Sequence, residues 1–366
     1  MKARVLQNNL QDMLDAVGCA IPGKSTLEIL THVVLQAGDG FLEAVGTDLA
    51  KGARVRRPAK VEAEGAVAVP YKTLRDLVRR LPKEVIDLEL DESTLSLAVR
   101  CANHKATVKG LDASDAPPVP SKLDGQKVTV DSATFLDTVR QVAVAASKDE
   151  VRPVLTGVHL LCGMDGLLME AADGYRLARA ERSESAARTC EVLVPVDSMR
   201  AVRSLINGKG DTVEIEFDEE KVLFRLFDAV LVAQLIAGDY PDVTSVIPDQ
   251  WNTTALVDTE QFRDALRATM VFGRDSDYVT TLRLSEGELV LSATSAERGE
   301  CSVPVPTKDQ EGDPMTVLVS SRYLVEAVLT LNTPEAVIRL VSPNRPLMVA
   351  PVGEERLTHI IMPIHK

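Results

Sequence analysis

The feature that most constrains this chain is an internal repeat. The segment Leu30–Leu35 (LTHVVL) recurs as Leu155–Leu160 (LTGVHL), 125 residues later. The pair Val69-Pro70, which precedes a helical pattern, recurs at the same spacing as Val194-Pro195. A third, weaker copy starts at Thr254. A period this long indicates three tandem domains rather than a solenoid of small repeats.

Each copy combines two helical patterns with several strand patterns, so the expected fold class is α+β. Apolar residues at i, i+3, i+4 and i+7 predict helices over Gln7–Val17, Tyr71–Leu81, Ser132–Lys148, Val196–Ile206, Thr259–Phe272 and Ser320–Leu331. Short apolar runs predict strands over Leu30–Leu35, Phe41–Val45, Val85–Leu90, Leu95–Val99, Leu155–Leu160, Thr281–Leu284 and Glu288–Ser292. Turns are expected at Asp39-Gly40, Asp165-Gly166, Asp173-Gly174 and Glu286-Gly287.

The domain boundaries follow from the repeat and from a proline-rich stretch. Pro117–Pro120 is a plausible linker between the first two copies. We therefore expect domains at 1–122, 123–250 and 251–366. A chain of 366 residues is also too long for a single core.

Composition narrows the class of protein. No run approaches the roughly 18 uncharged apolar residues that a membrane-spanning helix needs. Met1–Val5 enters a strand pattern directly, with no signal-peptide core. The 5 cysteines never form a C-x-x-C pair, which is typical of a reduced cytosolic protein without disulfides or a zinc site. We therefore expect a cytoplasmic protein, with no metal and no cofactor.

The net charge of −13 is unexpected for a nucleic-acid binder, but the charge is unevenly distributed. The predicted helices carry more basic than acidic residues, above all Tyr71–Leu81 with Lys72, Arg75, Arg79 and Arg80. A solvated helix face explains such a pattern equally well in a single domain. Repetition of the pattern across three copies favours a surface that faces phosphates. The 4% aromatic content argues against a single-strand binder, which stacks bases on aromatic rings.

Gly18–Ser25 matches the phosphate-binding pattern G-x-x-x-x-G-K-[ST]. That motif needs a strand before the loop and a helix after it, whereas here a helix precedes and a strand follows. Pro22 also removes one backbone N–H from the loop. A P-loop nucleotide-binding protein is therefore an unfavoured alternative. The chain has no H-x-x-x-H pair and no G-x-S-x-G motif, so we expect no catalytic residues and no enzyme.

Several motifs together resemble the bacterial β sliding clamps, the processivity rings of the replicative DNA polymerase III, along the whole chain. They are Ala171–Ala178 (AADGYRLA), Gly238–Asp242 with Val246–Pro248, Ser342–Pro346 and Ile361–Ile364. The resemblance implies three copies of the DNA clamp fold and a head-to-tail homodimeric ring that encircles duplex DNA independently of sequence. It implies helices that line the hole and sheets that form the outer wall. A ring that encircles DNA is held on it by topology and needs no tight contact. The negative net charge of the chain is therefore compatible with this function.

The resemblance also implies site residues and partners. Candidate DNA contacts are Lys24, Lys148 and Arg152, with Arg79, Arg80 and Arg203 added from charge alone. A cleft for short peptides of the replicative polymerase, the clamp loader, other polymerases and repair proteins would be formed by Leu155, Gly174, Tyr175, Arg176, Leu177, Pro241, Val246, Tyr323, Met362, Pro363 and Ile364. The dimer contact would join Val271 and Phe272 of one copy to Ala106 and Val108 of the other.

Two positions depart from the family pattern. Ala172 stands where the family usually has Thr, and Glu28 stands where Pro is frequent. Met362–Ile364 could also be no more than a frayed C-terminus. A clamp-like protein, such as one encoded by a phage, whose cleft serves other partners therefore stays open as a second reading.

Overall fold

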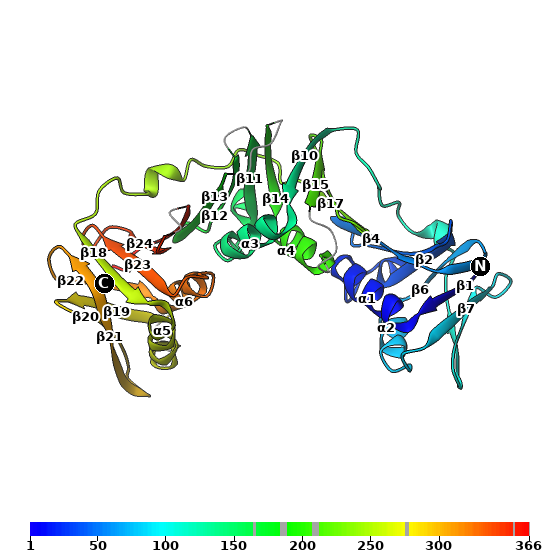
Figure 1. Ribbon diagram of the computed structural model, residues 1–366, viewed down its shortest axis with the longest axis horizontal. Coiled ribbons are helices and arrows are strands. Elements are labelled where there is room, and N and C mark those ends of the chain that lie inside the picture. The colour runs from blue at the N-terminus through cyan, green and yellow to red at the C-terminus, as the bar shows by residue number, and fades with distance from the viewer. Residues whose placement is uncertain (164–165, 184–188, 207–211, 275–277, 354–355, 366) are drawn as a thin grey trace. The chain divides into compact units, whose positions relative to one another are not determined.

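The computed structural model describes residues 1–163, 166–183, 189–206, 212–274, 278–353 and 356–365 (Figure 1). Asp165 of the expected Asp165-Gly166 turn lies outside the described residues. The chain forms two compact units, Met1–Ala133 with Asp197–Leu235 (unit 1) and Thr134–Val196 with Ile236–Lys366 (unit 2). None of the described helices is long and apolar enough to cross a membrane.

The first repeat begins with a strand that leads directly into a helix. Its elements are β1 (Lys2–Leu6), α1 (Gln7–Val17), the 3-10 turns η1 (Gly18–Ala20) and η2 (Glu28–Thr31), β2 (His32–Gly38), β3 (Phe41–Thr47), β4 (Lys51–Pro58), β5 (Lys60–Ala63), β6 (Gly65–Pro70), α2 (Tyr71–Val78), β7 (Val85–Asp91), β8 (Ser96–Cys101), β9 (His104–Lys109) and η3 (Ala113–Asp115).

The second and third repeats follow the same order. The second has β10 (Gln126–Asp131), α3 (Ser132–Val142), η4 (Pro153–Thr156), β11 (Gly157–Gly163), β12 (Gly166–Ala172), β13 (Arg176–Arg182), β14 (Cys190–Pro195), α4 (Val196–Leu205), β15 (Thr212–Phe217), β16 (Lys221–Arg225), β17 (Ala229–Gln234) and η5 (Thr244–Val246). The third has β18 (Thr253–Asp258), α5 (Thr259–Gly273), β19 (Val279–Ser285), β20 (Glu288–Ser295), β21 (Gly299–Glu311), β22 (Met315–Ser320), α6 (Ser321–Val328), β23 (Glu335–Leu340), β24 (Leu347–Pro351) and β25 (Leu357–Ile361). The predicted α+β triplication is confirmed.

The strands pair with their neighbours in antiparallel fashion. Unit 1 contains a five-stranded sheet, β5-β1-β7-β8-β9, and an eight-stranded sheet, β10-β15-β16-β17-β4-β3-β2-β6. Unit 2 contains a sheet of order β14-β11-β12-β13-β25-β24-β23-β18-β21-β20-β19-β22. Successive repeats are joined the same way, because β17 pairs with β4 and β25 pairs with β13. The last strand of each later repeat therefore extends a sheet of the repeat before it.

Helices pack on the sheets through fully buried leucines. In unit 1, α1 and α2 lie side by side (Figure 1), with Leu10, Leu14 and Leu74 buried between helix and sheet. Each such leucine contributes about 2 kcal/mol of transfer free energy. Gln7 donates a hydrogen bond from its Nε2 to the carbonyl of Val78, at 2.8 Å, and so ties the start of α1 to the end of α2.

Three predicted helices were too long. The helices expected to reach Leu81 and Leu331 end at Val78 and Val328, and the one expected to reach Lys148 ends at Val142. After each end the backbone tightens, as when the N–H of Leu81 bonds the carbonyl of Val78 and that of Leu331 bonds Val328. Bonds to the third residue back mark a 3-10 turn, which keeps the apolar spacing that extended the prediction.

The predicted strand starts at Leu30 and Leu155 were wrong in the same way. Both leucines lie in 3-10 turns, η2 and η4, and the strands begin two residues later. Each side chain is nonetheless buried. A buried leucine gives the same sequence pattern in a 3-10 turn as in a strand. Because the two repeats share this pattern, the same error was made in both.

Candidate partner-binding site

The hairpin between β12 and β13 forms a tight turn at Asp173-Gly174. The Asp173 Oδ1 accepts the backbone N–H of Tyr175 at 2.9 Å and that of Arg176 at 3.0 Å. Gly174 has φ +90°, where a side chain would be strained. The turn leaves the ring of Tyr175 62% exposed, which is unusual for a large side chain and typical of a contact surface.

Arg176 links this hairpin to the third repeat. Its Nε lies 3.1 Å from Asp173 Oδ2, and its Nη1 lies 2.5 Å from Glu326 Oε2 on α6. The guanidinium stands 4.4 Å from the ring centroid of Tyr323, a cation–π distance. The Arg176 side chain is only 11% exposed, so these contacts are partly shielded from water. Burial raises the pKa of the Tyr323 phenol.

The C-terminal segment is held against the hairpin. Met362 donates its backbone N–H to the carbonyl of Tyr175 at 2.8 Å, and Ile364 donates to the carbonyl of Leu318 at 2.7 Å. The first bond continues the pairing of β25 with β13, and the second joins the segment to β22. Met362–Ile364 is thus an ordered segment that borders Tyr175, and the frayed-terminus reading is wrong.

An apolar cluster lies beside the hairpin. Leu177 packs in one buried cluster with Val243 and Ile360, and Ile247 contacts that cluster. Val246 in η5 precedes Ile247 in the sequence and is 38% exposed. Pro241 is also exposed. Leu155 is buried at the end of η4, and its carbonyl accepts the N–H of Ser147.

Arg152 lies at the hairpin as well. Its Nη2 donates to the carbonyl of Asp173 at 3.2 Å, and a Cβ at Gly174 would come within 3.1 Å of its Nη1. Sequence resemblance assigned Arg152 to DNA, but the structure places its guanidinium on the turn that carries Tyr175. The resemblance also missed Asp173 and Glu326, the two carboxylates that hold Arg176. Asp173 could have been found from the Asp-Gly turn, whereas nothing in the sequence pairs Glu326 with Arg176.

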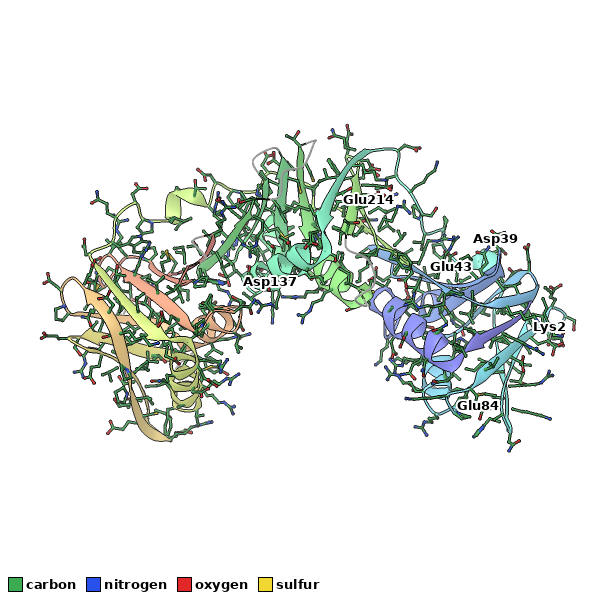
Figure 2. All side chains as sticks on the ribbon, viewed as in Figure 1. Lys2, Asp39, Glu43, Glu84, Asp137 and Glu214 are labelled. Carbon is green, nitrogen blue, oxygen red and sulfur yellow. The ribbon has the colours of Figure 1, made fainter. Side chains whose placement is uncertain are left out.

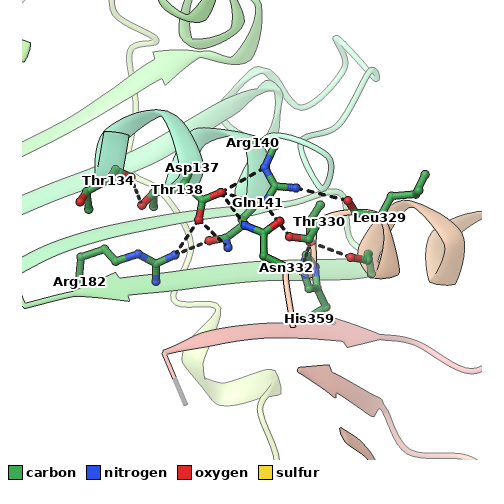
Figure 3. Close-up of polar contacts among 11 residues, drawn as sticks. Thr134, Asp137, Thr138, Arg140, Gln141, Arg182, Leu329, Thr330, Asn332 and His359 are labelled. Carbon is green, nitrogen blue, oxygen red and sulfur yellow. Dashed lines mark hydrogen bonds and ion pairs between the residues drawn. The ribbon is translucent and has the colours of Figure 1, made fainter. Parts of the chain in front are cut away.

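A polar network fixes the second repeat to the third on the helix side (Figure 3). Arg140 on α3 donates to the carbonyls of Leu329 at 3.3 Å and Thr330 at 2.8 Å, just beyond α6. Asp137 pairs with Arg140 at 2.8 Å and accepts a bond from Asn332 at 3.1 Å. A cation at the C-terminal carbonyls of a helix is electrostatically favourable.

His359 of β25 completes this network. Thr330 donates its hydroxyl to the carbonyl of Ala327 at 2.7 Å, so that its oxygen accepts from His359 Nε2 at 2.8 Å. Full burial, assisted by the charge of Arg176, lowers the pKa of His359 to about 3. The imidazole is therefore neutral near pH 7.

The candidate DNA contacts lie mostly in loops and on helix ends. Lys24 and Lys148 are exposed and occupy matching loops, each between the first helix of a repeat and a 3-10 turn. Arg80 and Arg203 are exposed, while Arg79 donates to Asp15 at 2.6 Å. Each of these side chains is thus available to solvent.

The candidate dimer contacts lie on two separate elements. Ala106 and Val108 are on β9, which ends the five-stranded sheet, and Val108 is buried. Val271 and Phe272 are near the end of α5, and Val271 is 51% exposed.

The P-loop alternative finds no support in the backbone. α1 precedes Gly18–Ser25, and only the four-residue turn η2 follows before β2. The carbonyl of Gly23 accepts a bond from Lys72 Nζ at 3.0 Å. No strand-loop-helix cradle for a phosphate is present at this motif.

Family models match the whole length of the chain. The N-terminal domain of the DNA polymerase III beta subunit matches residues 1–120, its central domain residues 129–242 and its C-terminal domain residues 244–365.

Individual relatives and solved structures agree. The chain is 30% identical over 375 residues to the beta sliding clamp of Synechococcus elongatus, covering 100% of this chain and 99% of the relative. It is 24% identical to that of Bacillus subtilis, with the same coverage. The crystal structures of the Bacillus subtilis sliding clamp and the Thermotoga maritima DNA polymerase III beta subunit superpose with TM-scores of 0.92, at 23% and 24% identity, each covering 100% of this chain and 99% of the other.

Proposed function

The chain belongs to the DNA polymerase III beta subunit family, the β sliding clamps, and from its strand edges we propose that this DNA sliding clamp works as a head-to-tail homodimeric ring. The observation that supports the ring is the recurrent junction between repeats. β17 pairs with β4, and β25 pairs with the matching strand β13. A third junction of this kind would join the last strand of repeat 1, β9, to the first half of β21.

Both of these strands have an open edge among the described residues. β9 pairs with β8 alone, and residues 299–306 of β21 pair only with β20. Unpaired strand edges favour pairing with another chain. A second copy would pair its β21 with β9, and two such junctions close a ring. Ala106 and Val108 lie on one of these edges, and Val271 and Phe272 would contribute from α5.

The register of the two intramolecular junctions carries over to the third. Leu231 opposes Ala53 and Val230 opposes Arg54 in the β17–β4 pair. Ala106 is equivalent to Leu231 and Cys301 to Ala53, so the matching positions would place Ala106 opposite Cys301 of the partner subunit. We expect Ala106→Cys to form a disulfide-linked dimer under mild oxidation, visible on non-reducing gels. Cys301→Ser in the same background should abolish it. An Ala106→Cys protein that sediments as a dimer without cross-linking would contradict this register, and a stable monomer would contradict the ring.

The ring would encircle duplex DNA and contact it through basic residues. Lys24 and Lys148 recur in matching loops and are the primary candidates, and Arg80, Arg203 and Arg79 are secondary ones. Non-specific contact of this kind is chiefly between Lys or Arg and phosphate. The topological model has a direct test: the protein is loaded by a clamp loader onto nicked circular DNA, which is then linearised. A ring slides off the ends, whereas retention on the linear DNA would indicate ordinary affinity binding.

The Tyr175 hairpin, with Arg152, Arg176, Tyr323 and the Met362–Ile364 segment, would form the docking site for short extended peptides of its partners. Those partners would be the replicative polymerase subunit, the clamp loader, and other polymerases and repair proteins. Leu155, Gly174, Leu177, Pro241 and Val246 complete the proposed surface.

The protein would act without catalysis of its own, as a tether. We further propose the domain boundaries 1–122, 123–250 and 251–366, and a cytoplasmic location at the nucleoid.

A further inference from the structure

The outer sheet faces of the three repeats can be compared residue by residue. In each repeat the first strand leads directly into the first helix, which aligns β1, β10 and β18. Arg4, Thr129 and Leu256 are therefore equivalent positions, and each side chain lies on the sheet face opposite the buried one. Strand pairing then identifies the equivalent residues on the neighbouring strands.

Repeat 1 carries ion pairs on this face. Arg4 pairs with Asp87 on β7, which pairs in turn with Arg100 on β8. The Arg4 Nε lies 2.6 Å from Asp87 Oδ1, and Arg100 Nη1 lies 2.9 Å from Glu89 Oε2. Lys2, labelled in Figure 2, extends the same face by pairing with Glu62 at 3.0 Å.

Repeat 2 carries the same kind of row. The residues equivalent to Arg4, Asp87 and Arg100 are Thr129, Glu214 and Arg225. Arg225 Nε lies 3.1 Å from Oε1 of Glu214, labelled in Figure 2, and Arg225 Nη2 lies 2.8 Å from Glu216 Oε1. Two repeats thus cover this face with charges of both signs.

Repeat 3 departs from both. The row equivalent to Arg4-Asp87-Arg100 is Leu256-Val337-Ala350, which is entirely apolar. The adjacent row is Thr254-Arg339-Met348, where Arg339 replaces the acidic residues Glu89 and Glu216. The charges of the Arg4-Asp87-Arg100 row are therefore replaced by apolar side chains in the third repeat.

These two rows form the floor of a groove of about 540 Å³. Its far wall is the end of β21, with the exposed carboxylates Asp309 and Glu311, and its other wall is Pro351–Gly353. A site of this volume accommodates several side chains of a bound molecule. An apolar floor rimmed by charges marks an interaction surface.

Arg339 is the central polar group of the groove. Its side chain is half-buried, and within the described part of the chain it has no ion pair or side-chain hydrogen bond. Partial burial of a guanidinium without a hydrogen-bond partner costs desolvation free energy. A carboxylate can recover that free energy, because it accepts two hydrogen bonds from a guanidinium. Lys308, by contrast, is paired with Glu335 at 2.7 Å. Among the described residues, the groove therefore offers one free cation on its floor and two free anions on its wall.

The spacing of these charges defines a ligand. Glu311 opposes Thr254, which opposes Arg339, so two strand spacings separate them. Two spacings amount to about 10 Å. A polyproline-like segment rises about 9 Å over three residues and returns to the same face. A cation and a carboxylate three residues apart would meet Glu311 and Arg339 together.

The same sheet face already accepts an extended segment of this chain. Val243, Ile247 and Trp251, between the second and third repeats, pack on the cluster that contains Val337 and Met348. Ala350 belongs to the same cluster, and Leu256 and Val352 pack against it, so the floor of the groove adjoins the part of the face that this segment covers.

We propose that the outer groove of the third repeat binds an extended peptide of a partner protein, with a basic residue and an acidic residue three positions apart and apolar side chains between them. The residues that line this groove include none of the Tyr175 hairpin, and its occupation does not depend on the proposed ring or on DNA.

The test uses the full-length protein and a defined probe. The probe is an acetylated, amidated octapeptide with the core Lys-Leu-Pro-Asp and a benzophenone at its N-terminus. Matched probes carry Asn for Asp, or Lys and Asp exchanged. Irradiation followed by mass spectrometry is expected to place the cross-link on residues of β18, β23 or β24. Replacement of Asp by Asn should weaken binding about tenfold, the effect of one charge-assisted hydrogen bond.

Two variants make the outcome decisive. Arg339→Glu should weaken the Lys-Leu-Pro-Asp probe at least tenfold, whereas Arg283→Glu, an equal charge change on exposed β19, should leave it unchanged. The triple variant Leu256→Thr, Val337→Glu, Ala350→Arg installs the row of repeat 2 and should abolish cross-linking while the circular dichroism spectrum is retained. Cross-links that persist in the triple variant, that map to Tyr175 or Met362, or that form equally with the Asn probe would overturn the proposal.

Discussion

The hairpin ends of repeats 1 and 2 have the same turn and different neighbours. Asp48 accepts the N–H groups of Ala50 and Lys51, as Asp173 accepts those of Tyr175 and Arg176. Lys51 pairs with its own Asp48 at 2.5 Å. The longer, forked guanidinium of Arg176 makes that local pair and also reaches Glu326 and Tyr323. One substitution, from Lys to Arg, turns a local contact into a link between repeats.

The coverage of the two hairpins differs as well. In repeat 1, Val119 of the Pro117–Pro120 segment lies over Gly52, where a Cβ would approach its methyl groups to 2.8 Å. The remaining pocket there measures only about 120 Å³. In repeat 2 the equivalent of Gly52 is Leu177, and Tyr175 and Val246 stay exposed beside it. The chain's own Val119 thus covers Gly52 at the first hairpin, whereas Tyr175 of the second hairpin stays exposed.

The largest expected effect comes from removing the segment that borders the open hairpin. Truncation after Ile361 deletes the backbone bonds from Met362 to Tyr175 and from Ile364 to Leu318. We expect stimulation of the polymerase to be lost in primer-extension assays, while the dimer persists in sedimentation. Full stimulation by the truncated protein would remove this segment from the docking site.

A pair of matched substitutions measures the difference between the two cations. Arg176→Ala leaves Asp173 and Glu326 without their shared partner and should lower the free energy of unfolding by about 2 kcal/mol, since the pair is partly buried. Lys51→Ala breaks a local pair and should cost under about 1 kcal/mol. Urea unfolding of both variants provides the comparison. Equal decreases in the free energy of unfolding would mean that the contacts of Arg176 with Glu326 and Tyr323 do not stabilise the fold.

The two junctions also differ in their response to pH. His359 occupies the position of Leu231 in the equivalent junction. Because the pKa of His359 is about 3 in the folded protein, only the unfolded chain takes up this proton below about pH 6.5. Its contribution to stability is present above that pH and is lost as pH falls toward 3, by up to about 1.4 kcal/mol per pH unit.

His359→Leu should remove this component, and the difference between wild-type and variant unfolding curves from pH 7 to 4 isolates it from the carboxylates. Parallel curves for the two proteins would show that His359 titrates normally in the folded state.

The smallest effect concerns the turns themselves. Leu49 has φ +77° at the position of Gly174, a conformation that costs a side chain about 1 kcal/mol. Leu49→Gly is expected to change the unfolding free energy by less than about 1 kcal/mol, because relief of strain is offset by backbone entropy. Gly174→Leu should cost about 1–2 kcal/mol, since its Cβ would also meet Arg152. Thermal unfolding of the two variants tests whether the turns are interchangeable.

Much of the fold could be predicted because the repeat presents the same pattern three times. The helix Gln7–Val17 was predicted to the residue, and the Asp39-Gly40 and Asp173-Gly174 turns lie where expected. The predictions were wrong where a buried side chain lies outside the regular helix or strand, as at Leu30, Leu155 and the ends of α2 and α6. Periodicity reports which side chains are buried, and it cannot distinguish an α-helical turn from a 3-10 turn.

The features of the candidate site also fall into those that the sequence predicts and those that it does not. The sequence by itself determined the triplication, the Asp-Gly turn and the residue types of the hairpin, since these depend on local backbone preference and on patterns along the chain. Only the tertiary structure decided that Arg176 meets Glu326 and Tyr323, that Arg152 lies on the hairpin, and that Leu256, Val337 and Arg339 share one groove. Those contacts join segments up to 150 residues apart, and the register of antiparallel strands, which no local pattern encodes, brings them together.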